Sequence, residues 1–186
     1  MILKEKERSV IEDLQTQEKS CVEKYGKYAE QARDPELKNL FRNIQQEEQK
    51  HYESLSMILS GSVPECNCND RSGRDYQPKA VYTAMSSPED KQHDAFLATD
   101  CIGTEKLVSG TYNDDVFAFE DSGVRKLLAD IQIEEQNHAE MLYKYKTVNG
   151  MAYKSEKTGS LRRTAWIHNW NMFQFDERKG HFSATY

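Results

Sequence analysis

The chain has few cysteines, no long apolar run and no excess of basic residues. Its four cysteines are scattered, which argues against a disulfide scaffold. No apolar stretch reaches the roughly 18 residues of a membrane-spanning helix, so we expect no membrane segment. The first residues lack the apolar core of a secretory signal, and we therefore expect a cytoplasmic protein, or one assembled from within the cell.

The balance of charge is acidic. The formal net charge is −6 and no dense basic patch is present, so nucleic acid is not expected as the main partner. Charged residues make up 30% of the chain, and the apolar residues recur with helical spacing, which together favour an all-α protein. The 186 residues suffice for one domain with a sizeable core and an appendage.

The motif Glu-Glu-Gln-x-His occurs twice, 87 positions apart. A further glutamate lies 30 positions before the second glutamate of each copy. The complete set is Glu18, Glu48 and His51 in the first half and Glu105, Glu135 and His138 in the second. The same offset relates other residues without a gap, which indicates a duplicated helix hairpin rather than a solenoid array.

Apolar residues recur every three or four positions in four segments, and the six repeated polar residues lie on these apolar faces. The sequence predicts a four-helix bundle over residues 1–153, built from repeat halves at about 4–60 and 88–148. Cys21 and Cys101 lie on the same inner faces and are expected as small core residues.

Each half has a turn signal midway between its paired glutamates. Asp34-Pro35 lies between Glu18 and Glu48, and Asp121-Ser122-Gly123 occupies the matching place in the second half. Each glutamate is then about 15 residues, or roughly 22 Å, from its turn. Antiparallel arms therefore bring the two carboxylates of a hairpin to one level.

Two segments lack a helical period. Residues 61–87 are rich in Gly, Pro, Ser, Asn and Asp, and we expect them to cross the length of the bundle between its second and third helices. Cys66 and Cys68 form a lone Cys-x-Cys there, which is a weak metal signal. Residues 154–186 are an aromatic-rich tail that packs on the bundle, contacts another chain or stays flexible. The tail has no cysteine, which excludes a rubredoxin-type iron centre.

The repeated residues suit two metal ions. A glutamate and a histidine three positions apart point to one side of a helix, carboxylates can bridge two cations, and imidazoles bind terminally. Four ionised glutamates in an apolar interior would repel one another, whereas two divalent cations neutralise them. For a single motif, a solvated helix face is the ordinary interpretation. The duplicated set on four apolar faces favours metal.

Four neighbouring residues belong to the same repeat. Tyr25 and Tyr112 follow the first glutamate of each half by seven positions, and they either donate hydrogen bonds to the ligands, take part in radical chemistry or pack in the core. Glu47 and Glu134 precede the motif glutamates and point about 100° away, to the surface or behind the ligands.

These residues resemble the ferritin-like di-iron and di-manganese proteins, which use one Glu from each of two helices and Glu-x-x-His from each of the other two. The ligand set is similar to that of rubrerythrins and bacterioferritin-type proteins. The resemblance implies two metal ions, with iron expected and manganese or zinc as alternatives. It implies that Glu48 and Glu135 bridge the ions and are the catalytic carboxylates, that Glu18 and Glu105 are terminal, and that His51 and His138 each hold one ion.

The second half is also similar to the spore coat protein F family. The likeness spans roughly 88–153, with a weaker echo over 8–60. It rests on Asp100, Thr104-Glu105-Lys106, Tyr112-Asn113, Leu127–Glu135, Glu135-Gln136-x-His138 and Asn149–Tyr153. It implies a place in the spore coat, with a homodimer or assembly with other coat proteins. Many members of that family lack a full ligand set, whereas this chain keeps all six residues.

Two functions stay open. One is enzymatic: a di-iron or di-manganese oxidoreductase that reacts with peroxide or oxygen, with an unidentified electron donor. The other is structural: the bundle and tail assemble into a larger layer without catalysis. Iron storage in a shell is a third, but nothing in the sequence specifies a cage.

Overall fold

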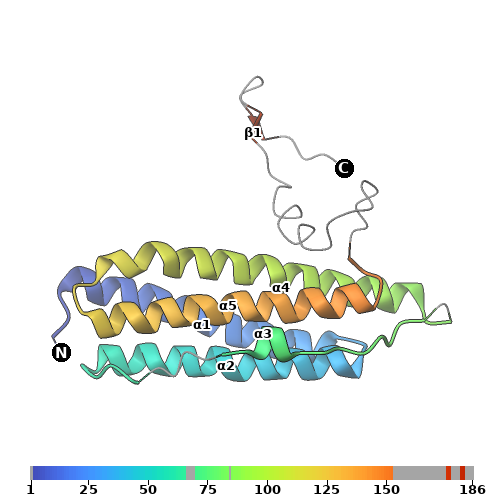
Figure 1. Ribbon diagram of the computed structural model, residues 1–186, viewed down its shortest axis with the longest axis horizontal. Helices are drawn as coiled ribbons and strands as arrows, with labels where there is room; N and C mark the ends of the chain where they lie inside the picture. Colours follow the sequence, from blue (N-terminus) through green and yellow to red (C-terminus); the bar gives the residue numbers. More distant parts are fainter. Residues whose placement is uncertain (1, 66–69, 84, 153–174, 177–180, 183–186) are drawn as a thin grey trace. The chain divides into compact units, whose positions relative to one another are not determined.

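The computed structural model describes residues 2–65, 70–83, 85–152, 175–176 and 181–182 (Figure 1). The chain divides into two units, Met1–Ala152 and Tyr153–Tyr186. The described part of the second unit is a two-stranded antiparallel pair, β1 (Phe175–Asp176) with β2 (His181–Phe182). Everything below concerns the first unit.

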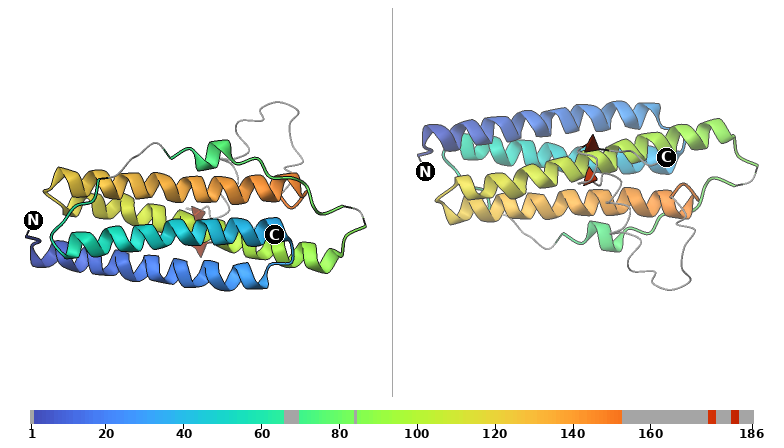
Figure 2. Two further views of the ribbon diagram at one scale, coloured as in Figure 1. Left: turned by 90° about the horizontal axis from the view of Figure 1, so that it is seen from below. Right: turned by 90° about the horizontal axis from the view of Figure 1, so that it is seen from above.

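The first unit is helical, which confirms the predicted all-α class. Its described elements are α1 (Glu5–Gln31), α2 (Pro35–Leu59), the short α3 (Ser72–Asp75), α4 (Pro88–Asp115), the 3₁₀ turn η1 (Val116–Ala118) and α5 (Ser122–Val148). The helix α1 packs along α2 and α4 packs along α5, so the sequence repeat corresponds to two helix hairpins (Figures 1 and 2).

The helix starts have clear local causes. The Asp34 side chain accepts the backbone N–H of Glu36 and Pro35 occupies the first position of α2, where no N–H is needed. Asp121 accepts the N–H groups of Gly123 and Val124 at the start of α5. The two short turns therefore lie where the glutamate midpoints place them, and each reverses the chain.

In the described part of the segment between α2 and α4, the short helix α3 packs against α5 (Figure 1). Buried Asp94 of α4 fastens this arrangement. Its carboxylate accepts the backbone N–H groups of Arg33 and Asp34 and the hydroxyl of Tyr82. The side-chain oxygen of Asn149 accepts the N–H groups of Val81 and Tyr82. At one end of the bundle these hydrogen bonds therefore connect the α1–α2 turn, residues 81–82, α4 and the end of α5.

The core between the long helices is apolar toward both ends of the bundle and polar midway along it. Its largest side chains include Phe41, Ile44 and Leu128, all fully buried. None of the helices described combines the length and apolar content that a membrane crossing needs. The predictions for Cys66, Cys68 and the aromatic tail lie outside the described residues, apart from β1 and β2.

Candidate metal centre

The six repeated residues meet midway along the bundle. The helix α1 supplies Glu18, α2 supplies Glu48 and His51, α4 supplies Glu105, and α5 supplies Glu135 and His138. All six residues are at most 3% exposed. The helical spacing accounts for this, because each residue occupies the inner face of its helix, one of the positions that is otherwise apolar.

The six side chains form two overlapping groups. One comprises Glu18, Glu48, His51 and Glu135, and the other comprises Glu48, Glu105, Glu135 and His138. Within each group one oxygen or nitrogen from every residue lies within 4.8 Å of the others. Glu48 and Glu135 belong to both groups. This is the arrangement of two neighbouring cation positions that share two carboxylates.

Each histidine directs Nδ1 into the cluster. Nδ1 of His51 lies 3.0 Å from Oε1 of Glu135 and 3.5 Å from Oε2 of Glu48. Nδ1 of His138 lies 3.0 Å from Oε1 of Glu48 and 3.4 Å from Oε2 of Glu105. The two rings stack with their centroids 5.9 Å apart. The approximate two-fold relation between the halves is therefore present in the site itself.

Eight buried side-chain atoms of this cluster have no hydrogen-bond partner. They are Oε2 of Glu18, both oxygens of Glu48, Nδ1 of His51, Oε2 of Glu105, both oxygens of Glu135 and Nδ1 of His138. Among the described residues no other buried side-chain nitrogen or oxygen is in this condition. An unpartnered buried polar group costs about 1–3 kcal/mol, and more when charged. Together the eight atoms form a donor set of carboxylate oxygens and imidazole nitrogens. Such a set fits divalent iron, manganese or zinc.

Burial and crowding raise the pKa of two of the carboxyls. Burial, moderated by the His51 ring and reinforced by the charge of Glu48, raises the pKa of Glu18 to about 7. Burial and the neighbouring charges of Glu48 and Glu105 raise the pKa of Glu135 well above its usual value. Without cations, the cluster therefore holds protons at neutral pH.

The pKa shifts of Glu48 and the two histidines instead favour the charged forms: the pKa of Glu48 is lowered and those of His51 and His138 are raised. Burial opposes ionisation of Glu48, but the adjacent imidazoles of His138 and His51 outweigh it and lower its pKa. Burial likewise opposes protonation of His138, yet the carboxylates of Glu105 and Glu48 raise its pKa to about 10. Protons thus take the place that cations would occupy between these groups.

The two tyrosines bond across the bundle. The hydroxyl of Tyr25 in α1 donates to Oε1 of Glu105 in α4, and that of Tyr112 in α4 donates to Oε1 of Glu18 in α1. Both rings are fully buried, so they are core residues and hydrogen-bond donors together. The sequence places each tyrosine near the glutamate of its own helix, whereas the structure pairs it with the glutamate of the other half.

Glu134, which the sequence leaves either at the surface or behind the ligands, lies behind the ring of His51. Its Oε2 lies 2.7 Å from Nε2 of His51, on the side of the ring away from the cluster. The side chain of its counterpart in the repeat, Glu47, is instead 45% exposed and pairs with Lys50. The contact depends on the packing of α2 against α5, which motif spacing cannot reveal. A carboxylate behind a histidine fixes the tautomer and orientation of the ring.

The remaining candidates lie apart from the cluster. Cys21 and Cys101 are free and buried, as expected of core residues, and burial raises the pKa of both thiols. The ring of His93 faces the carbonyl of Gln31 near the α1–α2 turn.

Family comparisons divide the chain into the same halves. The rubrerythrin family model matches residues 2–59, which contain α1 and α2. The Coat F domain model matches residues 93–155, which contain most of α4 and all of α5. No curated protein and no solved structure matches the chain. Both families are ferritin-like, so each half of the chain is similar to a ferritin-like family, and the paired hairpins and the buried Glu/His cluster agree with this similarity.

Proposed function

We propose that the protein binds two divalent metal ions, iron foremost, in a carboxylate-bridged centre formed by the six clustered residues. The carrying observation is the set of eight unpartnered buried atoms, all of which belong to these residues. Two cations would balance four carboxylates in charge. Apart from one another, these atoms have no partner among the described residues.

The hydrogen bonds support a division of roles among the glutamates. Glu18 and Glu105 each have one oxygen bonded to a tyrosine and only Oε2 unpartnered, which suits a terminal ligand at one ion. Glu48 and Glu135 have both oxygens unpartnered and belong to both groups, which suits bridging ligands. His51 and His138 each serve one ion through Nδ1.

We further propose that the centre serves redox protection, with peroxide or dioxygen as the oxidant. Bound iron or manganese would supply the electron transfer. The chain contributes a site shielded from bulk water, two tyrosine hydroxyls that hold the terminal carboxylates, and Glu134, which orients the His51 ring. Glu48 and Glu135 have no anchoring hydrogen bond and so are free to change position when the charge on the metals changes.

The test is metal content followed by peroxide treatment. The full-length protein is loaded with ferrous iron without oxygen, dialysed and assayed by elemental analysis, beside Glu48→Gln with Glu135→Gln. We expect about two ions per chain in the parent protein and none retained in the double variant. Glu47→Gln, at a partly exposed position in the same motif, is the matched control and should keep both ions.

The two parts of the proposal fail separately. No retained metal in the parent protein would reject the centre. Retained iron whose absorption spectrum peroxide leaves unchanged would reject the redox role and leave metal binding in place.

A structural role in a spore coat is the second candidate, and the Coat F match to residues 93–155 favours it. In that function the bundle assembles with other coat proteins. We interpret residues 61–87 as the ferritin-like crossover of that bundle. Assembly would then not need metal. The Glu48→Gln and Glu135→Gln double variant should assemble like the parent protein, and loss of assembly along with the metal would count against this candidate.

A further inference from the structure

One face of α4 is apolar although it points away from the bundle. Phe96, Leu107 and Phe117 are 64%, 72% and 85% exposed. Gly103 and Gly110 lie on the same face, and a Cβ built on either would meet nothing within 4 Å. Steps of seven, four and three residues place Phe96, Gly103, Leu107 and Gly110 on one side of α4, and Phe117 lies seven residues further on, in η1, which follows α4 directly. We call these five residues the α4 face.

The glycines of the α4 face have no purpose within the described bundle. Glycine is among the least favourable residues in a helix interior, and both positions have room for a larger side chain. Glycines on a helix surface let a second helix approach closely. Large apolar side chains exposed on the same face indicate that a partner covers it.

The α4 face is nearly symmetric about its own centre. The midpoint between Phe96 and Phe117 coincides with the midpoint between Gly103 and Gly110, between Lys106 and Leu107. A two-fold axis at that point would set Phe96 of one copy beside Phe117 of another, and Gly103 beside Gly110. A surface that matches itself in reverse is what a two-fold homodimer requires.

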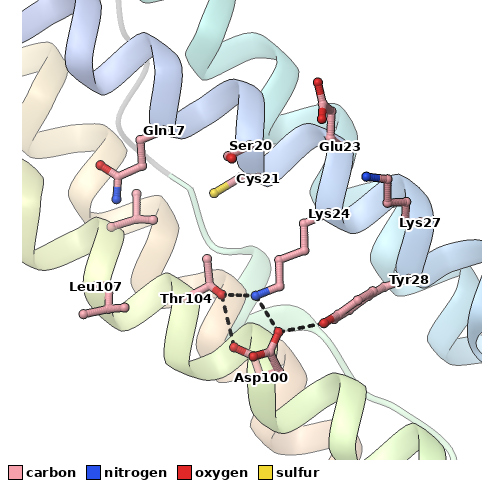
Figure 3. A pocket seen from close by; sticks show the side chains of 11 residues that line it. Gln17, Ser20, Cys21, Glu23, Lys24, Lys27, Tyr28, Asp100, Thr104 and Leu107 are labelled. Carbon is pink, nitrogen blue, oxygen red and sulfur yellow. Dashed lines mark hydrogen bonds and ion pairs between the residues drawn. The ribbon is translucent and has the colours of Figure 1, made fainter.

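Charged residues beside the α4 face also follow the proposed two-fold symmetry, with a lysine near one end of α4 and aspartates at the other. The groove between α1 and α4 has a volume of about 520 Å³ and is lined by Leu107 and by Lys24 and Lys27 of α1 (Figure 3). Lys24 pairs with Asp100, whereas Lys27 has no ion pair among the described residues. At the other end of α4 are Asp114 and Asp115. Burial and the negative charges of Asp114 and Asp13 raise the pKa of Asp115, which marks this end as acidic and short of cations.

The levels of these charges agree with the symmetry. Tyr28, next to Lys27, bonds Asp100, so Lys27 stands near the level of residue 100. Reflection about the midpoint carries residue 100 to 113, adjacent to Asp114. Lys27 of one copy therefore lies opposite the acidic end of α4 in a second copy.

We propose that the α4 face is the two-fold interface of a homodimer, in which α4 packs antiparallel on α4 of a second copy and Lys27 pairs with Asp114 across the interface. A strip of one helix about 32 Å long and about 10 Å wide covers about 320 Å². Specific interfaces bury about 800 Å² per partner. The α1 flank therefore has to belong to the interface, as the position of Lys27 requires. The proposal is independent of metal binding.

Light scattering and sedimentation equilibrium on the full-length protein test the interface. The expected mass is twice 21.6 kDa. Leu107→Glu, which places two like charges at the axis, should raise the dissociation constant by about tenfold or more without loss of helical circular dichroism. The matched control is Ile133→Glu, at an exposed apolar position of α5, and it should remain dimeric.

A charge exchange tests the orientation. Lys27→Glu alone should weaken the dimer, more so at low salt, and adding Asp114→Lys should restore it. A monomeric parent protein, a dimer that survives Leu107→Glu, or a double variant no tighter than Lys27→Glu would each overturn the proposal. If residues 153–186 or a different protein cover the α4 face, the parent protein will be monomeric, which overturns the proposal.

Discussion

At the scale of single residues, the carboxyls of the cluster have different protonation tendencies although they share one cavity. Glu48, between two imidazoles, has a lowered pKa, whereas Glu135, among other carboxylates, has a raised one. The difference follows from their neighbours, because both side chains are completely buried. Metal binding would remove it, since a ligand carboxylate is ionised.

The metal-free protein should lose stability as the pH rises from about 5 to 9. The folded pKa of Glu18 is raised to about 7, so the folded state binds more protons, and its contribution is lost as the pH rises through that value. The folded pKa of His138 is raised to about 10, so its contribution is present below its unfolded pKa and is lost toward pH 10. Thermal melts with a chelator, recorded across this pH range, measure the trend. A melting temperature that rises with pH would contradict it.

Tyr25→Phe and Tyr112→Phe should each lower the free energy of unfolding of the metal-free protein. Each removes a buried hydrogen bond to a carboxyl, worth about 1.5–3 kcal/mol when the acceptor is charged. Denaturant unfolding measures the loss, and Tyr52→Phe, at a half-buried position of α2, is the control. Equal stability of all three variants would mean that the hydroxyls do not stabilise the site.

At the scale of helices and turns, the sequence predicts what depends on nearby residues. Asp34-Pro35 and Asp121 cap helices by contacts two or three positions away, and the repeat brings the six site residues to one level. The contact of Glu134 with His51 joins residues 83 positions apart. The hydrogen bonds from the two tyrosines to glutamates of the other hairpin join residues 80 or more positions apart. Such contacts follow from how the hairpins pack, and no local spacing encodes them.

Asp94 illustrates a tertiary contact whose loss should be costly. Asp94→Ala would leave two backbone N–H groups of the α1–α2 turn and the hydroxyl of Tyr82 without their acceptor. We expect a loss of about 3 kcal/mol in the free energy of unfolding. Urea titration measures it, with Asp90→Ala, whose side chain is 49% exposed, as the control. A loss no larger than that of the control would show that water replaces the carboxylate.

At the scale of the whole molecule, the site joins the two hairpins. Each half alone supplies two glutamates and one histidine, and both groups draw residues from both hairpins. Metal binding therefore requires the assembled bundle and should stabilise it. Since ligands must lose protons to bind, the stabilisation should grow with pH, opposite to the trend of the metal-free protein.

Metal at about a hundredfold above its dissociation constant should add about 2.7 kcal/mol to the stability. For a domain of this size that corresponds to a rise of about 5–10 °C in melting temperature. Scanning calorimetry with and without ferrous iron or manganese, at two pH values, measures the shift. The Glu48→Gln and Glu135→Gln double variant should show none.

Anomalous diffraction from crystals loaded with iron or manganese tests the central claim most directly. Two peaks among the side chains of Glu18, Glu48, His51, Glu105, Glu135 and His138, with Glu48 and Glu135 contacting both, are the predicted result. Absence of any peak between the helices after loading, or six side chains that turn away to other partners, would contradict it.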